Sequence, residues 1–220
     1  MNKTALIVAG GSGLRMGTGI PKQFLPLNGK PILMHTIEKF YSAKIFDSIY
    51  VVLPHSETIH WSKLISELNF TLPHKIVTGG TSRYESVKNG LKAIPEQKGM
   101  IAIHDGVRPL VSIELIRKCM AELDNFSNAV PAIPIVDTLR KVEDLESEVV
   151  DRNALRAIQT PQCFHLELIR KAYENPERDT TDDASVFEQD GNLIHLVEGE
   201  KSNLKITVLT DLIIAEALIK

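Results

Sequence analysis

The sequence predicts an α/β fold, with a mostly parallel sheet, helices on both faces and a projecting β-hairpin arm. Short, nearly all-apolar runs alternate with segments of helical periodicity, which is typical of an open parallel sheet covered on both faces. Two extended segments around an acidic loop predict the arm. The length of 220 residues fits one large domain, residues 1–220, better than two small ones.

The predicted strands are apolar along most of their length, as expected of strands buried on both faces. The first run, TALIVA, leads directly into Gly10 and Gly11, so the chain turns sharply where that strand ends. The strands are expected at residues 4–9, 48–53, 74–78, 100–104 and 129–135, with a further strand at 193–197.

The helices between these strands are predicted from apolar residues at helical spacing and from end signals. Ser82 and Glu85 have the spacing of a capping box, and Gly191 is placed to end a helix. The helices are expected at residues 31–41, 57–68, 82–91, 113–123, 166–173 and 182–189, with a terminal helix from about Asp211.

The arm, residues 136–156, is predicted as two extended segments, 137–142 and 148–152, around the acidic loop 143–146. An isolated two-stranded hairpin is marginally stable in water. A partner surface would stabilise it, which indicates a homodimer. The alternative, a hairpin folded against its own sheet, is equally compatible with the sequence.

Composition excludes several classes of protein. The formal net charge of −3 does not suit a nucleic-acid-binding protein. No apolar stretch approaches the roughly 20 residues of a membrane-spanning helix, and the N-terminal segment does not read as a signal peptide. Cys119 and Cys163 have no metal-binding spacing and are expected to be reduced thiols. These features predict a cytoplasmic protein that binds neither nucleic acid nor membrane.

The glycine-rich loop after the first strand, AGGSGLRMG, is the strongest site signal. Glycines let the backbone approach a ligand closely, and their amides can bind an anion. A dinucleotide-binding GxGxxG pattern fails at Met16, and no Gly-Lys-Ser/Thr tripeptide completes a Walker A motif. Two cations, Arg15 and Lys22, follow the glycines and suit the stabilisation of charge on a phosphorus under attack. The alternative is a glycine turn with two solvated basic residues.

Two further strand ends carry polar residues. The segment GGTSRYES offers amides and hydroxyls that can hydrogen-bond the edge of a base, although by itself it also fits a plain strand-to-helix turn. In HDGVRP, Asp105 can accept sugar hydroxyls or lie near Mg²⁺ through water, and Arg108 can pair with Asp105 or with phosphate. His104 is expected to be a structural residue. No residues are assigned as ligands of a protein-held metal.

Cationic residues also occur later in the chain. Arg152 lies on the predicted arm with Thr138, Thr160 begins the TPQ segment, and Lys205 follows Asn203 near the C-terminus. Arg152 and Lys205 are a pair that could hold a phosphate monoester. Each of them, taken alone, is better explained as a surface charge.

Together these segments resemble the 2-C-methyl-D-erythritol 4-phosphate cytidylyltransferases over essentially the whole chain. The matching motifs are AGGSGLRMG, PKQF, GGTSRYESV, HDGVRPL, DTLRKV, DRNALRAIQTPQ, TDDAS and VEGEKSNLKITVLTDL, in that order. The resemblance implies a Rossmann-like nucleotidyltransferase sheet and a reaction in which the substrate phosphate attacks the α-phosphorus of CTP and pyrophosphate leaves. It also implies Mg²⁺ as a companion of the triphosphate.

The resemblance implies a role for each matching residue. The catalytic group is Arg15, Lys22, Arg152 and Lys205. The CTP-binding group is Gly10, Gly11, Ser12, Gly13, Gly80, Arg83, Ser86 and Asp105. The substrate-binding group is Asp105, Arg108, Thr138, Arg152, Thr160 and Lys205. Thr138 and Arg152 would come from the neighbouring subunit of a homodimer, so that its arm completes the site.

Other functions fit the sequence less well. A ribitol-5-phosphate cytidylyltransferase would share the PKQF, cationic-loop and TPQ segments, but the Asp137 and Arg140 pattern, DRN and TDDAS favour the methylerythritol enzymes. A nicotinamide-dependent oxidoreductase leaves Arg15 and Lys22 without a task. A non-catalytic nucleotide-binding module would tolerate loss of Lys22.

Overall fold

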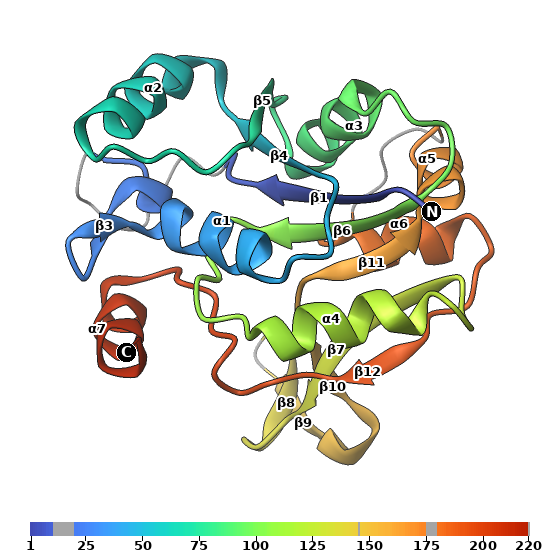
Figure 1. Cartoon of the computed structure of the whole chain (residues 1–220). Helices are drawn as coiled ribbons and strands as arrows, with labels where there is room; N and C mark the ends of the chain where they lie inside the picture. The colour runs from blue at the N-terminus through green and yellow to red at the C-terminus, as the bar shows by residue number, and fades with distance from the viewer. Residues whose placement is uncertain (11–19, 145, 175–179, 220) are drawn as a thin grey trace.

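The computed structural model describes residues 1–10, 20–144, 146–174 and 180–219. The strands of its main sheet are β1 (Lys3–Val8), β4 (Ser48–Leu53), β5 (Lys75–Thr78), β6 (Met100–Asp105), β7 (Asn128–Pro134), β10 (Arg156–Ile158), β11 (Gln162–His165) and β12 (Leu196–Glu198). They form one eight-stranded sheet in the order β10-β7-β11-β6-β1-β4-β5, with β12 paired to β7 (Figure 1). The predicted strands at residues 4–9, 48–53, 74–78, 100–104 and 129–135 all appear, with ends shifted by no more than a residue.

The sheet is mixed, with its parallel part at β6-β1-β4-β5. Strand β11 runs antiparallel to both β6 and β7, and β10 runs antiparallel to β7. The sequence did not predict β10 or β11, because three- and four-residue strands containing Arg156, Gln162 and His165 lack a long apolar run. The strand predicted at 193–197 lies further along the chain, at β12.

Helices cover both faces of the sheet, as predicted (Figure 1). They are α1 (Ile32–Ser42), α2 (Thr58–Glu67), α3 (Arg83–Ala93), α4 (Ile113–Glu122), α5 (Leu166–Ala172) and α6 (Asp183–Gln189). Successive β1 side chains alternate between two cores: Ala5 and Ile7 pack with α1, α2 and α4, whereas Leu6 and Val8 pack with α3, α5 and α6. This period of two explains why the strands had to be apolar throughout.

A smaller third core lies beside the main sheet. Helix α7 (Leu209–Leu218) packs on the short hairpin of β2 (Pro26–Leu27) and β3 (Lys30–Pro31). The hairpin turns at Asn28 and Gly29, both with positive φ, and Asn-Gly is the pair that such a tight turn favours. The Asn-Gly pair is visible in the sequence. The hairpin was nevertheless not predicted, because strands of two residues are too short to show an alternating apolar pattern.

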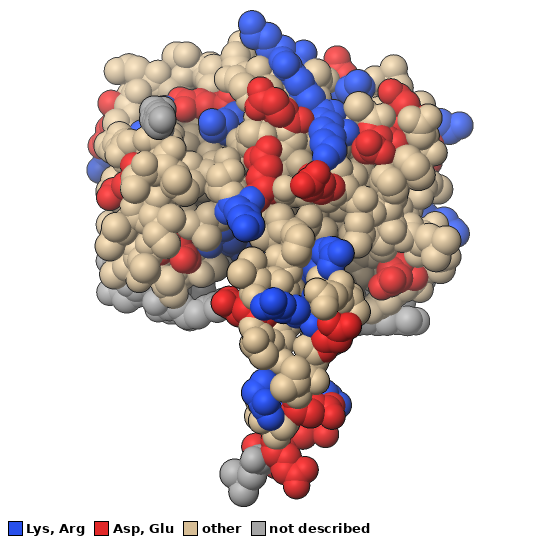
Figure 2. Space-filling model, turned by 90° about the horizontal axis from the view of Figure 1, so that it is seen from below, with Lys and Arg blue, Asp and Glu red and all other residues tan. Residues whose placement is uncertain are grey.

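The arm is formed by β8 (Leu139–Glu143) and β9 (Glu146–Val150), which pair only with each other and project from the body (Figures 1 and 2). The predicted loop 143–146 is wrong, because Glu143 and Glu146 form the last pair of the antiparallel ladder. Arg152 was placed on the second extended segment and instead lies in a 3₁₀ turn, η4 (Arg152–Ala154). Among the described residues, the arm strands form a sheet separate from the main one.

The two cysteines are free thiols in the described structure, as expected. They are distant in sequence, yet Cys119 of α4 and Cys163 of β11 are both fully buried in the same core. Burial and the neighbouring Cys119 thiol raise the pKa of Cys163 well above its usual value. Over the described ranges, no helix has the length and apolarity needed to cross a membrane.

Candidate functional site

The candidate site is a cavity of about 430 Å³ at the carboxyl ends of β1, β5 and β6. Val8 and Asp105 are opposite each other where the parallel pair β1-β6 ends, and such strand ends are where open α/β sheets bind ligands. The described residues that line the cavity are Val8, Ala9, Gly10, Lys22, Gln23, Gly80, Thr81, Ser82, Arg83, Ser86, Asp105, Val107 and Lys205. Segments from the whole length of the chain therefore meet at one place.

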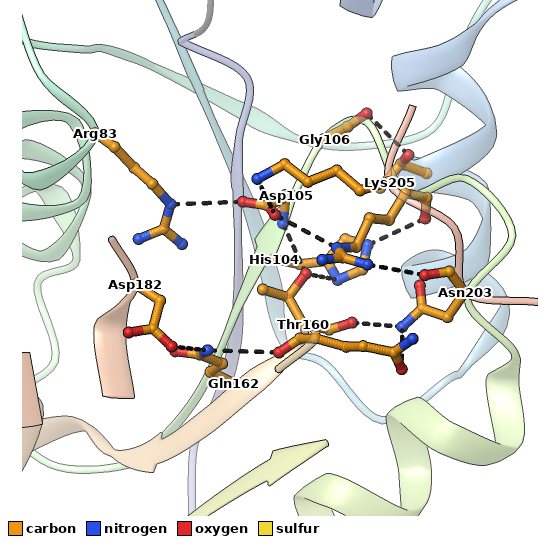
Figure 3. Close-up of polar contacts among 12 residues, drawn as sticks. Arg83, His104, Asp105, Gly106, Thr160, Gln162, Asp182, Asn203 and Lys205 are labelled. Atoms are coloured by element: carbon orange, nitrogen blue, oxygen red, sulfur yellow. Dashed lines mark hydrogen bonds and ion pairs between the residues drawn. The ribbon is translucent and has the colours of Figure 1, made fainter. Parts of the chain in front are cut away.

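Asp105 is the centre of a cluster of charges in this cavity (Figure 3). Its Oδ1 lies 3.5 Å from Arg83 Nε, and its Oδ2 lies 3.0 Å from Lys205 Nζ and 3.4 Å from Arg108 Nε. Burial alone would raise the pKa of Asp105, but the charges of Arg83, Lys205 and Arg108 hold that pKa well below its usual value. Asp105 is therefore ionised at neutral pH, and the cluster retains an excess of positive charge that suits an anionic ligand.

The turn between β5 and α3 is held by its own side chains. Ser82 caps α3 by accepting a hydrogen bond from the Glu85 amide at 3.1 Å, as predicted. The Glu85 carboxylate accepts from the amide and the hydroxyl of Thr81, at 2.6 and 2.5 Å. The Gly80 amide donates to Ser86 Oγ at 3.1 Å. A Cβ at Gly80 would lie 2.3 Å from the Glu85 Cβ, so only glycine fits there.

A buried polar layer lies behind Asp105 (Figure 3). Burial lowers the pKa of His104 to about 3, so its ring is neutral. Its Nε2–H then donates to the Arg108 carbonyl at 3.2 Å, and its Nδ1 accepts from the Thr160 hydroxyl at 3.0 Å. The Thr160 oxygen also accepts from the Asp105 amide at 3.1 Å, while Asn203 binds the Thr160 carbonyl and accepts from Arg108 through its own carbonyl, both at 2.8 Å.

This layer changes how two predicted substrate residues are interpreted. Thr160 is 4% exposed and its hydroxyl is used within the protein, and it does not line the cavity as described. Arg108 is likewise buried and outside the lining, although it contacts Asp105. Both residues orient Asp105 from behind. His104 is structural, as expected.

Lys22 and Gln23 reach the cavity from the short 3₁₀ helix η2 (Lys22–Phe24). The helix is anchored by Phe24, which is buried and stacks on Trp61 with ring centroids 5.8 Å apart. Gln23 is fully buried, and neither its amide nitrogen nor its amide oxygen has a hydrogen-bond partner among the described residues. An unpaired buried amide is costly, which makes Gln23 a candidate ligand contact that sequence reasoning missed. The PKQF motif contained it without distinguishing it from Lys22.

The remaining predicted residues lie elsewhere. Thr138 and Arg152 are exposed near the base of the arm and do not line the cavity as described, and Arg152 donates to the Val136 carbonyl. Four predicted residues, Gly11, Ser12, Gly13 and Arg15, fall outside the described residues. Over the described ranges, no group of three or more histidine, cysteine, aspartate or glutamate side chains is arranged to hold a metal ion.

The comparisons with known proteins agree on one family. The family model described as "IspD: 2-C-methyl-D-erythritol 4-phosphate cytidylyltransferase" matches residues 4–220. Proteins of that name from Phocaeicola vulgatus and Bacteroides thetaiotaomicron are 46% and 44% identical to this chain over 220 residues, covering 100% of both chains in each case. The crystal structure of 4-diphosphocytidyl-2C-methyl-D-erythritol synthase from Anaerococcus prevotii has a TM-score of 0.85 at 31% identity, covering 99% of this chain and 95% of that one.

Proposed function

The chain belongs to the 2-C-methyl-D-erythritol 4-phosphate cytidylyltransferase family, and we propose that it performs the family's reaction in the cavity around Asp105. It is a cytidylyltransferase that moves a cytidylyl group from CTP to 2-C-methyl-D-erythritol 4-phosphate in isoprenoid biosynthesis. The products are 4-diphosphocytidyl-2-C-methyl-D-erythritol and pyrophosphate. The observation that supports this location is the convergence of Lys22, Arg83 and Lys205 with Asp105 at the strand ends.

The chemistry needs no protein nucleophile. A phosphate oxygen of the acceptor forms a bond to the α-phosphorus of CTP, and the bond from that phosphorus to the β-phosphate oxygen breaks with its electron pair on pyrophosphate. The acceptor phosphate is already anionic at neutral pH, so a general base is dispensable. What the site must supply is position and positive charge. We assign charge stabilisation at the α-phosphate to Lys22 together with Arg15.

The nucleotide half of the site is assigned to the strand ends. We assign recognition of the base to the backbone at Gly10 and Gly80 and to the side chain of Ser86, and acceptance of the ribose hydroxyls to Asp105, because all four residues line the cavity. Lys205 remains 40% exposed at its side chain while paired with Asp105. Its charge is therefore accessible to the acceptor phosphate.

The acceptor half is assigned in part to a second subunit. Thr138 and Arg152 do not line the described cavity of their own chain, and the arm that carries them is a hairpin without sheet partners in the body. Exposed valines on and beside the arm, Val136, Val142 and Val149, suit burial against a partner. We infer a homodimer in which each arm brings Arg152 to the site of the other subunit.

Magnesium is assigned to the substrate complex. Asp105 is the one carboxylate among the described cavity-lining residues, and its cationic neighbours disfavour a bare divalent ion there. Mg²⁺ commonly combines one carboxylate with waters and substrate phosphates, which fits this donor set. Mg²⁺ would neutralise part of the triphosphate charge, and Asp105 would hold it through water. A cytoplasmic location, expected from the sequence, stays a prediction.

The direct test is a pyrophosphate-release assay that crosses CTP, UTP, ATP and GTP with methylerythritol, ribitol and glycerol phosphates. Release is expected only with CTP and 2-C-methyl-D-erythritol 4-phosphate. Preferential use of ribitol 5-phosphate would reject the acceptor. Full activity of an Asp105→Asn variant would reject the location of the site.

A further inference from the structure

We propose that Asp183, with the help of Tyr173, is a positioning residue that fixes the guanidinium of Arg83 beside Asp105 and so prepares the nucleotide half of the site. This inference rests on the proposed assignment of the cavity to CTP. The TDDAS segment, which carries Asp183, resembles the family but has no role in the mechanism described above.

Arg83 lies between two carboxylates. Its two terminal nitrogens donate to the two oxygens of Asp183, Nη1 to Oδ1 at 2.9 Å and Nη2 to Oδ2 at 2.7 Å. Its Nε faces Asp105 Oδ1 at 3.5 Å (Figure 3). A bidentate pair fixes the plane of the guanidinium, so the Nε of Arg83 has one defined place beside Asp105.

Asp183 is itself held tightly. It is fully buried, and the Tyr173 hydroxyl donates to its Oδ1 at 2.6 Å. Tyr173 stacks on Tyr84, the residue that follows Arg83 in α3, with ring centroids 4.8 Å apart. Burial would lower the pKa of Arg83, but Asp183 raises it well above the usual value, so the guanidinium keeps its charge.

The segment around Asp183 is also attached to the sheet. Gln162 of β11 accepts from the Ala184 amide at 2.8 Å and donates to Asp182 at 2.8 Å. Asp182 caps α6 by accepting from the Ser185 amide at 3.0 Å. These hydrogen bonds fix the carboxylate of Asp183 relative to the sheet. Because Arg83 is bound to that carboxylate, the first turn of α3, which belongs to the base-side segment, is fixed relative to the sheet as well.

The consequence is specific for CTP. If Arg83 were released from Asp183, its charge would be free to move toward Asp105 or toward a phosphate, and the first turn of α3 would lose its link to the sheet. CTP affinity should then fall, whereas recognition of the acceptor phosphate by Lys205 should change little. A purely structural role would lower thermal stability without this selectivity.

The test uses the full chain and measures CTP binding by calorimetry without acceptor, together with steady-state kinetics. Asp183→Asn keeps the shape and removes the charge, and its CTP affinity is expected to fall about tenfold or more, with the acceptor KM within about twofold of the original. Tyr173→Phe should shift CTP affinity in the same direction by a smaller factor. It serves as the test if Asp183→Asn does not fold.

A double-mutant cycle with Arg83→Met separates positioning from folding. In the Arg83→Met background, Asp183→Asn should cause no further loss of CTP affinity, and it should restore thermal stability because it removes an unpaired buried charge. Additive losses in CTP affinity would overturn the proposal.

The matched control is Glu188→Gln, which also changes a carboxylate to an amide on α6 but at an exposed position. CTP affinity should stay unchanged in this variant, because Glu188 takes no part in holding Asp183. Equal losses in Glu188→Gln and Asp183→Asn would show a general sensitivity of α6 to loss of charge and would also overturn the proposal. If the unmodified chain bound no CTP, the proposed function itself would fail, which is a different outcome.

Discussion

The charge cluster at Asp105 and the arm β8–β9 are opposite solutions to the placement of charged residues. Around Asp105, which is 7% exposed, Arg83 and Arg108 are held between buried carboxylates and carbonyls. On the arm, Arg140 and the ion pair of Lys141 with Glu143 are exposed. The body orders its charged side chains by contacts within one chain. The arm leaves its charged side chains and its valines exposed, so that a partner subunit can contact them.

The difference indicates how the work of the site is divided. Buried, hydrogen-bonded charges are preorganised and need no rearrangement when a ligand arrives, which suits recognition of the nucleotide and stabilisation of charge. Exposed side chains on a marginal hairpin acquire a fixed place only against a partner. The nucleotide half is therefore expected to form within one subunit, and the acceptor half only in an assembly.

The largest effect is expected from removal of a cavity cation. Lys22→Ala should lower kcat by a factor of about 10² to 10³, the usual cost of losing one preorganised charge-stabilising group, with a smaller change in CTP affinity. Stopped-flow turnover and calorimetric CTP binding measure the two quantities. Lys63→Ala is the matched control, because Lys63 is exposed on α2, outside the cavity lining as described, and pairs with Glu67 at 3.6 Å. Equal losses in turnover and in binding would contradict a role confined to the transition state.

The second prediction tests whether the arm acts on the partner. Arg152→Ala should reduce kcat/KM for the acceptor by about 30-fold or more, since a phosphate would lose a charged partner. When this variant is mixed with Lys22→Ala chains, subunit exchange should create dimers with one intact site and restore about one quarter of the unmodified activity. Mixing with no recovery, despite proven exchange, would place Arg152 and Lys22 in the same subunit's site.

The sequence predicted more of the body than of the site. Its alternating apolar runs and helices were sufficient for the parallel half of the sheet, because burial on both faces leaves a strong signal in six consecutive residues. Strand β11 gave no such signal, and yet it carries Gln162 and Cys163 into the centre of the fold. Motifs located Asp105, Arg83 and Lys205 but gave no indication that they contact one another.

The residues whose surroundings the sequence did not reveal share a physical cause. Thr160 belongs to a motif near the site, but its hydroxyl is directed into a buried network with His104 and the Asp105 amide. Asp183 and Gln23 are polar residues of ordinary type whose burial decides their importance. Burial of a polar residue depends on contacts between segments that are distant in the sequence. A single sequence gives no signal of such contacts when the polar residue is not part of an apolar pattern.

The third prediction concerns the pH dependence of the buried layer. The pKa of His104 falls from 6.5 to about 3 on folding because of burial. The unfolded chain therefore binds a proton that the folded chain excludes, and stability is lost as pH falls from 6.5 toward 3. The slope from His104 approaches about 1.4 kcal/mol per pH unit in this window.

Urea unfolding at several pH values measures this slope, and His104→Gln should remove the contribution of one group. His35 and His74 also have pKa values lowered by burial, so part of the slope should remain in the variant. Folding lowers the pKa of Asp105, so this residue also reduces stability as pH falls, but only below its unfolded pKa of 3.8. An unchanged slope between pH 4 and 6.5 would mean that His104 is protonated within the fold.

The smallest effect is expected from the apolar surface of the arm. Val142 and Val149 are 68% and 63% exposed, so Val→Thr at both should change the free energy of unfolding of the monomer by no more than about 0.5 kcal/mol. If the partner buries these side chains, the same change should raise the dimer dissociation constant by about tenfold, as expected from the loss of a few buried methyl groups. Sedimentation at a series of concentrations measures the constant. Ile59→Thr, at an 83% exposed position on α2, is the control. If the dissociation constant changed equally in both variants, the arm valines would not be part of the dimer interface. The arm and the Asp105 cluster would then differ only in how exposed their side chains are.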